Sequence, residues 1–503
     1  MSRHVPSGEP GAGRTVLQLS PGELAGAAAS LLASGCRLAL VGAHDAPGRL
    51  RVVYLFTSGP PDRRVEVHVE LDRRDPTVPS LAALSFPASR FEREMRDLFG
   101  IEPLGHPMPR RLVLHQHWPT GWYPMRHDAS RAPAMVDDAS PYPFVEVEGR
   151  GVYEIPVGPV HAGLIEPGHF RFSVVGETIV RMKARLWFTH KGVERLFEGR
   201  EARAGMELAE RVSGDSAVGH GLAYCLAVEE ACRIEVPARA GELRAVLVEL
   251  ERLYNHVADV GAMCNDVGFG LANARALTLR ERLLRLNAEV TGHRLLRGGV
   301  VVGGAELRRL PNLDELREIG ERFREVVDLA TGSAVVMDRF LGTAVLGNRE
   351  AEEVGVLGVV ARASGLTLDA RVAHPFVDPP AGFAPAHDDA GDVLARFRVR
   401  CHEVDTSLSL LTSLVCGDGR LSASGPRRGE AGASHGSGIV EGWRGSVVHR
   451  VEVDGAGRLT RVKIVDPSFL TWPALSIALA DTIVPDFPLA NKSFNLSYAG
   501  NDL

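Results

Sequence analysis

The sequence lacks the segments that would insert it into a membrane or export it. No run of roughly 18 or more apolar residues occurs anywhere in its 503 residues. The N-terminal stretch Met1–Pro6 has no apolar core of the kind that a secretory signal needs. We therefore expect that this chain does not cross a membrane by itself.

Cysteines are few and unpaired. Six occur, at positions 36, 225, 232, 264, 401 and 416, and no two of them form a CxxC motif. Scattered thiols are typical of a reducing cytoplasm and argue against a disulfide framework. They also give no support for a zinc site or an iron–sulfur cluster, so we expect this chain to bind no metal.

An excess of positive charge is absent as well. The formal net charge is −6 and the isoelectric point is near 6.3. The whole chain therefore offers no basic surface for nucleic acid or anionic lipid. We expect its partners to be proteins or small molecules, and no nucleic acid.

What is present indicates a folded protein of the α+β class with at least two domains, because 503 residues exceed a single core and 45% of them are hydrophobic. Ser20, Pro21 and Glu23 form a helix start. The segments 36–41, 50–57 and 64–72 are predicted strands, and residues 65–71 alternate strictly, as expected for a strand with one buried face. Residues 417–438 are rich in Gly and Ser and are predicted to be a surface loop, followed by a hairpin of strands 447–453 and 459–465.

A charged helix over residues 91–101 precedes two short motifs. The string ERExxDLFGI is followed by GHPxxRRLxL and by WYPMR at 122–126. On the residues alone this is a salt-bridged helix, ended by Gly100, and a turn. The ordered set of motifs resembles the C subunit of respiratory complex I. The resemblance implies a small α/β-sandwich-like docking domain, in which Glu92, Arg93, Glu94 and Asp97 are structural and interfacial.

A polar, proline-bearing linker separates this domain from the rest. We expect a disordered tail at 1–14, the domain resembling the complex I C subunit at 15–126, the linker at 127–143 and a second domain at 144–503. Amphipathic helices at 241–263, 278–296 and 313–329 predict a helical bundle at the centre of the second domain, with small peripheral sheets.

Two motifs open the second domain. GPVHAGLIEPGHF at 158–170 sets His161, Glu166 and His169 among Gly, Pro and aliphatic residues, and HKGVERLFE follows at 190–198. By itself the first motif is a polar turn before a strand. Together they resemble the large subunit of group 4 nickel–iron hydrogenases and the related D subunit of complex I, with the closer match on the hydrogenase side.

The turn at 210–220 lies at the centre of this resemblance. Hydrogenases of this fold hold nickel and iron through four thiolates, from one CxxC within RxCGxCxxxH and a second CxxC near the C-terminus. Here Ser213 and Ser216 stand at the first pair within an otherwise matching frame of Arg211, Gly214 and His220. We find no second pair before the chain stops, and Ser hydroxyls ionise too reluctantly to replace thiolates. We therefore expect a nickel-free cavity.

The candidate wall of this cavity comprises Arg211, Ser213, Ser216, His220 and Arg444, the last matching the arginine beside the hydrogenase iron. In complex I the same cavity receives quinone, so quinone is a possible ligand. The quinone-binding tyrosine falls on Gly214, and His161 matches a loop histidine.

The candidate general acids and bases are His161, Glu166, His169 and Asp259. The resemblance links Asp259 to proton coupling and Glu166 to proton transfer. On the residues alone Asp259, like Asn255 one turn before it, is equally well a member of an internal ion pair or a helix cap. The charged residues at 358–371 and 391–403 likewise read as a helix end and a charged helix face.

The resemblance implies an oxidoreductase subunit that is active only within a complex. Its partners would be an iron–sulfur subunit like the B subunit of complex I, which carries the clusters, and membrane antiporter-like subunits. The chain would lie in the cytoplasm, peripheral to the inner face of the cell membrane, and couple electron transfer to proton movement. The alternative is a non-catalytic scaffold with a relic cavity.

Overall fold

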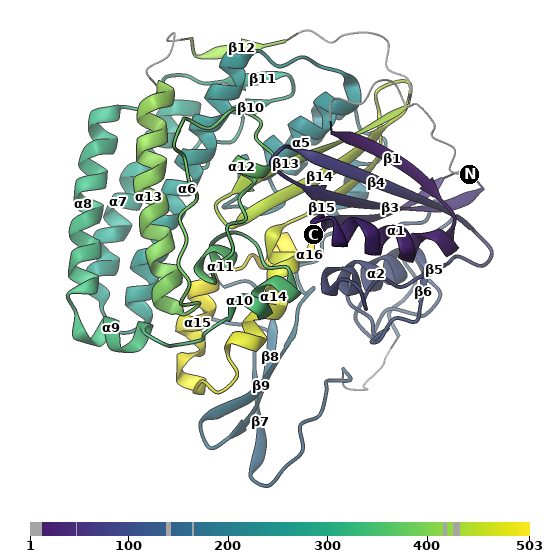
Figure 1. The fold of residues 1–503 in the computed structure, drawn as a ribbon, viewed down its shortest axis with the longest axis horizontal. Coiled ribbons are helices and arrows are strands. Elements are labelled where there is room, and N and C mark those ends of the chain that lie inside the picture. The colour runs from purple at the N-terminus through teal and green to yellow at the C-terminus, as the bar shows by residue number, and fades with distance from the viewer. Residues whose placement is uncertain (1–12, 47, 137–141, 163–164, 416–419, 426–432) are drawn as a thin grey trace.

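The computed structural model describes residues 13–46, 48–136, 142–162, 165–415, 420–425 and 433–503. In Figure 1 the N-terminal β-sheet domain lies at the right and a bundle of long helices at the left, with further strands between them, at the top and at the bottom. The predicted α+β class is confirmed. Most of the predicted tail falls at residues 1–12, outside the described residues.

The N-terminal domain is a four-stranded sheet in the order β1-β4-β3-β2, with β1 parallel to β4 and the other pairs antiparallel. Its elements are β1 (Arg14–Leu19), α1 (Pro21–Ala33), β2 (Arg37–Ala46), β3 (Arg49–Ser58), β4 (Arg63–Asp72), β5 (Thr77–Pro79), α2 (Phe86–Phe99) and β6 (Glu102–Leu104). The predicted start of α1 is confirmed, since the Glu23 carboxylate accepts from the backbone N–H and the hydroxyl of Ser20. Strand β1 was not predicted, because its parallel partner β4 lies far along the chain.

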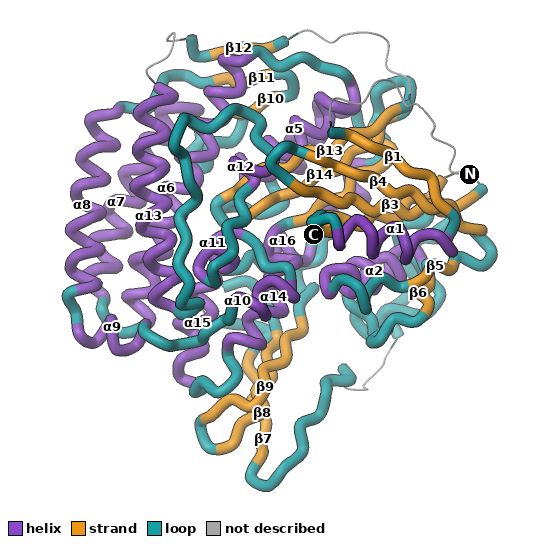
Figure 2. The backbone as a smooth tube through the Cα atoms, viewed as in Figure 1, coloured by secondary structure: helices purple, strands orange, loops and turns teal. Residues whose placement is uncertain are grey.

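The second domain opens with a three-stranded antiparallel sheet that extends away from the body, drawn in orange at the bottom of Figure 2. They are β7 (Val152–Val157), β8 (His169–Val175) and β9 (Thr178–Arg185). Short elements follow: α3 (Val193–Phe197), a 3-10 turn (Ala202–Gly205) and α4 (Met206–Ala209). They lead into the buried helix α5 (Ala217–Cys232), directly after the central turn.

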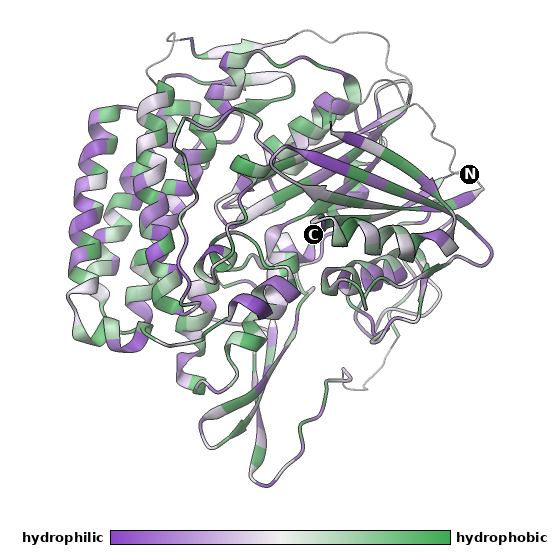
Figure 3. Cartoon of the chain, viewed as in Figure 1, coloured by the Kyte–Doolittle hydropathy of each residue, from purple (hydrophilic) through white to green (hydrophobic). Residues whose placement is uncertain are grey.

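Four long helices form the predicted bundle: α6 (Ala238–Asp266), α7 (Gly270–Thr291), α8 (Leu313–Thr331) and α13 (Val393–Val415). Hydrophilic and hydrophobic residues alternate along these helices in Figure 3, and on α8 the apolar residues, such as Leu316, Ile319 and Phe323, are the buried ones. Helix α7 starts at Gly270 rather than at 278, because Ala272 and Ala276 extend its buried face by about two turns. The smaller elements around the bundle are β10 (Val300–Val301), β11 (Gly304–Glu306), α9 (Ala334–Phe340), α10 (Asn348–Val354), α11 (Gly358–Ala363), α12 (Ala370–Ala373) and β12 (Ser422–Ser424).

A second antiparallel sheet, β13 (Ser434–Gly442), β14 (Gly445–Val453) and β15 (Leu459–Val465), packs on α5. The predicted β14–β15 hairpin is confirmed. The predicted loop was too long, because β12 lies within it and β13 begins at Ser434. Gly436 and Gly438 allow β13 to pack closely on α5. A Cβ atom on these residues would lie 2.3 and 2.0 Å from the Ala227 and Ala223 carbonyl oxygens of α5.

The C-terminal segment folds back over the domain through α14 (Pro467–Ala478), a 3-10 turn (Val484–Asp486), α15 (Phe487–Phe494) and α16 (Tyr498–Asp502). Within the part of the chain that the structure describes, no helix combines the length and apolarity that a bilayer span requires.

The two domains meet through buried polar groups, and this changes the prediction for β4. Its alternating residues were expected to have one solvated face, yet Glu66 and His68 are buried against the second sheet. Glu66 accepts hydrogen bonds from Arg450 on β14 at 2.9 and 3.1 Å. Glu94 of α2 accepts from Lys463 on β15 at 2.8 Å. The expected structural role of the α2 acids is confirmed, since Glu92 and Asp97 are buried acceptors of backbone N–H groups.

Candidate functional site

The central turn is fixed by hydrogen bonds from three directions. The Asp215 carbonyl accepts from Trp443 Nε1 at 2.8 Å, from Asn255 Nδ2 at 2.9 Å and from the Tyr254 hydroxyl at 3.2 Å. Such a carbonyl cannot change direction without breaking several bonds at once. The turn is therefore a rigid element between α4 and α5.

A buried carboxyl on α6 supports the first turn of α5. Glu251 accepts the backbone N–H groups of Val218 and Gly219 at 2.7 and 2.9 Å, where a helix N-terminus presents unpaired donors. Burial raises the pKa of Glu251 to about 8, although these two N–H groups lower it. Glu251 was not among the predicted site residues. Its position in the helical pattern is like that of the other buried residues of α6, so the pattern does not single it out.

Arg444 and Asp215 form a bidentate ion pair on one wall of the site. Arg444 donates from its two Nη atoms to the two Asp215 oxygens at 2.6 and 2.7 Å, and from Nε to the Asn495 carbonyl at 2.6 Å. Its guanidinium also lies 3.9 Å from the Trp443 ring centroid. Burial would raise the pKa of Asp215, but the charge of Arg444 holds it below its usual value.

The C-terminal segment completes this site. The hydroxyl oxygens of Ser213 and Ser497 lie 2.8 Å apart, and both side chains are buried. Ser497 and Gly500 repeat the three-residue spacing of Ser213 and Ser216, within the C-terminal segment where the resemblance implies a second thiolate pair. This segment carries no cysteine, and only the folding of the chain brings Ser497 beside Ser213.

The donors that meet here do not fit a nickel–iron centre. Ser213, Ser216 and Ser497 supply neutral hydroxyls where such a centre needs soft thiolates. The five cysteines among the described residues are buried in the body of the protein and none lines this site. Burial raises the pKa of the Cys264 thiol to about 12, so this thiol is protonated at neutral pH.

A cavity of about 420 Å³ opens between the central turn and the C-terminal segment. Its polar lining comprises Glu166, Ser213, Asp215, Asp266, Arg444, Asn491, Lys492, Asn495, Ser497 and Tyr498. This volume lies within the usual range for small-molecule sites of about 300–1,000 Å³. The cavity combines ionisable groups, hydroxyls and one phenol, and can accept a small polar ligand.

The four predicted acid–base residues do not gather in one place. Glu166 lines the cavity and accepts the Ala499 N–H at 3.0 Å. Asp259 is buried just outside the lining, where Arg400 Nε and Asn495 Nδ2 donate to it at 3.0 and 2.7 Å. Asp259 is therefore a member of an internal ion pair, which is one of the two roles that the sequence alone allowed.

The two predicted histidines tie the ends of their own loop together. His161 Nε2 lies 2.8 Å from the Gly168 carbonyl oxygen, and His169 Nδ1 lies 3.3 Å from that of Gly158. Neither histidine lines the cavity. Their catalytic role stays a prediction, and their contacts in this structure are with the backbone.

The predicted wall residues divide in a similar way. Ser213 and Arg444 line the cavity, and Ser216 lies directly behind, 3.2 Å from Arg444 Nη1. Arg211 points outward, half exposed, and pairs with Glu207 of its own helix turn. His220 is fully buried on the far side of α5.

His220 belongs to a buried group of three residues behind the site. Its Nε2 lies 2.9 Å from Asp466 Oδ2 and its Nδ1 lies 3.0 Å from His449 Nε2. Burial holds the pKa of His449 well below its usual value, so this imidazole is neutral. His220 thereby connects α5 to β14 and α14 and does not reach the cavity.

Tyr498 is a cavity residue that sequence reasoning missed. Its hydroxyl is buried beside the Asn491 side chain and donates to no acceptor among the described residues. Burial raises the pKa of Tyr498 to about 12, so the phenol keeps its proton at neutral pH. The sequence offered only one signal, the polar and aromatic character of the C-terminal segment.

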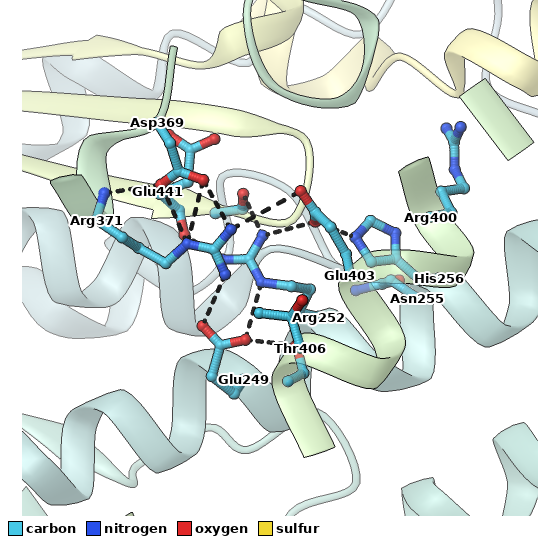
Figure 4. Close-up of polar contacts among 12 residues, drawn as sticks. Glu249, Arg252, Asn255, His256, Asp369, Arg371, Arg400, Glu403, Thr406 and Glu441 are labelled. Carbon is cyan, nitrogen blue, oxygen red and sulfur yellow. Dashed lines mark hydrogen bonds and ion pairs between the residues drawn. The ribbon is translucent and has the colours of Figure 1, made fainter. Parts of the chain in front are cut away.

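The charged residues around α13 form a buried ionic network (Figure 4). They were expected to be a helix end and a charged helix face, but they are enclosed between α6, α12, α13 and β13. Arg252 lies between Glu249 and Glu403, at 3.1 and 3.3 Å, and His256 Nε2 lies 2.7 Å from the same Glu403 oxygen. The network comprises Arg252, Arg362, Arg371, Glu249, Asp369, Glu403 and Glu441. Partners of opposite charge compensate the cost of burying each group.

Comparison with known proteins identifies two family models in this chain. Residues 18–133 match the model described as "Respiratory-chain NADH dehydrogenase, 30 Kd subunit". Residues 266–417 match the model described as "Respiratory-chain NADH dehydrogenase, 49 Kd subunit".

Curated relatives match over most of their length. Formate hydrogenlyase subunit 5 of Escherichia coli (strain K12) is 33% identical over 457 residues, covering 87% of this chain and 79% of that protein. Hydrogenase-4 component G of the same organism is 32% identical, covering 87% and 78%. The C/D subunit of NADH-quinone oxidoreductase from Bacteroides thetaiotaomicron is 29% identical, covering 74% and 75%.

A chain from the structure of the membrane-bound sulfane sulfur reductase, described as an archaeal respiratory membrane complex, has a similar fold. Its TM-score is 0.64 at 24% sequence identity, covering 70% of this chain and 99% of that chain. The two family models and the relatives above lead to one assignment. The chain belongs to the complex I-related family in which the 30 kDa and 49 kDa domains are fused, together with the large subunits of group 4 hydrogenases.

Proposed function

We propose that the chain is the nickel-free cavity subunit of a membrane-associated, complex I-related oxidoreductase and couples electron transfer to proton movement. It would dock an iron–sulfur subunit like the B subunit of complex I, which carries the clusters, and reach the inner face of the cell membrane through antiporter-like subunits. The relatives are named as subunits of formate hydrogenlyase, hydrogenase-4 and NADH-quinone oxidoreductase, which supports a role in such a complex.

One observation carries the proposal. Ser213 and Ser216 stand where the resemblance to hydrogenases implies a thiolate pair, yet a cavity of about 420 Å³ remains beside them. A cavity that had merely lost its metal could collapse at little cost, whereas this one keeps Glu166 and Tyr498 in its lining.

The cavity can hold a quinone-type headgroup without the tyrosine that Gly214 replaces. The protonated Tyr498 hydroxyl has no other acceptor among the described residues and can donate to a ligand carbonyl. Glu166 can take up or release a proton beside it. The chain's own residues would thus bind and orient the headgroup and supply protons, while the partner's clusters would supply electrons.

Titration with a short-chain quinone analogue tests this proposal on the chain purified with its partner subunits. Removing only the Tyr498 hydroxyl, in Tyr498→Phe, should cost one hydrogen bond of about 1–1.5 kcal/mol. The Kd for the analogue should therefore rise by about 5–10-fold. Tyr153→Phe is the matched control, because its exposed hydroxyl bonds the Gly176 carbonyl on the distant sheet of β7, β8 and β9. Equal Kd values for all three proteins would contradict the proposed binding mode.

A scaffold without turnover is the second candidate, and a different observation favours it. Asp215 and Arg444 satisfy each other, and Asp259 is held by Arg400 and Asn495, so these charges need no ligand. If the complex binds no analogue and Glu166→Gln leaves its electron-transfer rate unchanged, the scaffold function replaces the first. The exposed Glu177→Gln provides the control for that rate measurement.

A further inference from the structure

A cluster of metal-ligating side chains lies between the two domains, well away from the cavity. Glu66 and His68 come from β4 of the N-terminal domain, and His435 comes from β13 of the second domain. One donor atom from each lies within 4.8 Å of the others. From this juxtaposition we propose that Glu66, His68 and His435 bind one divalent transition-metal ion, zinc by preference, which clamps the two domains together.

The distances suit a zinc ion. His68 Nε2 lies 2.9 Å and His435 Nε2 lies 3.4 Å from Glu66 Oε2. Tetrahedral zinc with bonds of about 2.0–2.1 Å holds neighbouring ligands roughly 3.3–3.4 Å apart. Small movements of side chains would bring the three donors to that spacing, so the backbone already holds them in position.

The chemistry of the donors is selective. Two imidazoles and one carboxylate are ligands that zinc accepts, with water at the fourth position. No metal was expected from the sequence, because that expectation considered thiols, whereas this cluster forms only when the two sheets pack together.

The site has an entry path and supporting contacts. Glu66 and His68 are buried, while the His435 side chain is 27% exposed and leaves room for a water ligand. Gln18 Nε2 on β1 lies 3.3 Å from His68 Nδ1, and turning this amide over would let its oxygen accept from an Nδ1–H once Nε2 binds metal.

The neighbouring arginine limits the affinity but does not block the site. Arg450 donates from Nε to both Glu66 oxygens at 3.1 Å and from Nη2 to Oε2 at 2.9 Å. Its Nη1 also contacts Glu452 at 2.7 Å, so a second carboxylate compensates its charge. The metal would share Oε2, and Oε1 would stay on Arg450.

Zinc titration of the full-length chain, stripped with EDTA and dialysed, tests the proposal. We expect one zinc per chain, bound at micromolar free zinc or below, and a rise in Tm on binding. Changes to groups that only orient a metal ligand already weaken binding by about 10–100-fold. His68→Gln and His435→Gln should therefore each weaken it at least about 10-fold. His127→Gln is the matched control, because that exposed histidine also lies beside a carboxylate, 3.8 Å from Glu198.

Cobalt substitution of the unmodified chain keeps the test decisive should a variant fail to fold. Binding through nitrogen and oxygen gives weak visible bands without the intense near-ultraviolet band of a thiolate. Absence of one-to-one binding by the unmodified chain, a thiolate band, or equal affinity in folded His435→Gln would each overturn the proposal. None of these results depends on the cavity, so they leave the proposed function untouched.

Discussion

Replacing Lys463 with methionine tests whether buried ion pairs hold the two domains together. Lys463 Nζ on β15 lies 2.8 Å from Glu94 Oε1 on α2 and 3.0 Å from Glu194 Oε1 on α3, and all three side chains are buried. Methionine keeps most of the aliphatic volume but removes the charge. Two carboxylates would then share a buried interface without the cation between them.

The expected loss is large because one partner of a buried pair remains unpaired. Such a change costs about 3–5 kcal/mol in free energy of unfolding. Glu194 keeps Arg461 at 2.7 Å, so Glu94 bears most of the loss. Burial and the charge of Glu194 already raise the pKa of Glu94 against the opposing effect of Lys463. In the variant that pKa should rise further.

The direction of the pH dependence follows from this rise. A carboxyl whose pKa is higher in the folded than in the unfolded protein destabilises the fold above that pKa. The deficit shrinks as the pH falls through it towards the unfolded value. The stability deficit of Lys463→Met should therefore be larger at about pH 8 than at about pH 5.5.

Urea unfolding at both pH values, followed by tryptophan fluorescence, measures this difference. Lys191→Met is the control, because Lys191 is exposed and should change stability by less than about 0.5 kcal/mol. A Lys463→Met variant within about 0.5 kcal/mol of the unmodified chain would refute the reasoning, as would a deficit equal at both pH values.

Three further predictions concern a glycine, a pair of serines and a buried carboxyl. Gly100→Ala should lower stability by about 1–3 kcal/mol in thermal unfolding, because Gly100 has φ +67° and a Cβ would lie 2.4 Å from the Tyr123 ring; an unchanged Tm would contradict this. Ser213→Cys combined with Ser497→Cys should form a disulfide on oxidation, because the two hydroxyls lie 2.8 Å apart; mass spectrometry without reductant detects it, and persistent free thiols would argue against the placement. Burial raises the pKa of Glu251 to about 8 from 4.5, so its contribution to stability falls as the pH rises between these values; Glu251→Gln should flatten that slope in a pH series of melting curves.

Local signals in the sequence predicted much of the fold. The capping box of Ser20 and Glu23, the left-handed Gly100 that ends α2 and the periodic apolar faces of the bundle are determined by residues a few positions apart. Such features depend on steric and hydrogen-bonding rules within one turn or one helix face. Sequence pattern therefore predicts them before any tertiary contact is known.

The rest depends on contacts between distant segments. Gly436 and Gly438 indicate a flexible loop by composition, yet they permit a strand to approach α5 closely. Glu66 and His68 indicate a solvated strand face, yet another sheet covers them. The alternating pattern of a strand predicts which residues share a face, but it does not predict what packs on that face.

The same distinction between local signals and distant contacts applies to the candidate site. Ser213 and Arg444 line the cavity, and the sequence predicted them because they lie in or beside well-marked motifs. Tyr498 and Ser497 were missed because they reach the site only after the C-terminal segment folds back over it. His161 and His169 share their loop with the cavity residue Glu166, but their ring nitrogens face backbone carbonyl groups of the loop.

Metal analysis of the chain isolated with its partner subunits tests the central claim most directly. Ser213, Ser216 and Ser497 place hydroxyls where thiolates would be needed, and hydroxyls do not hold nickel at neutral pH. We therefore predict nickel far below one atom per copy of this chain, even after growth with added nickel and with the partner's iron fully present. One nickel per chain, retained through gel filtration, would contradict this claim.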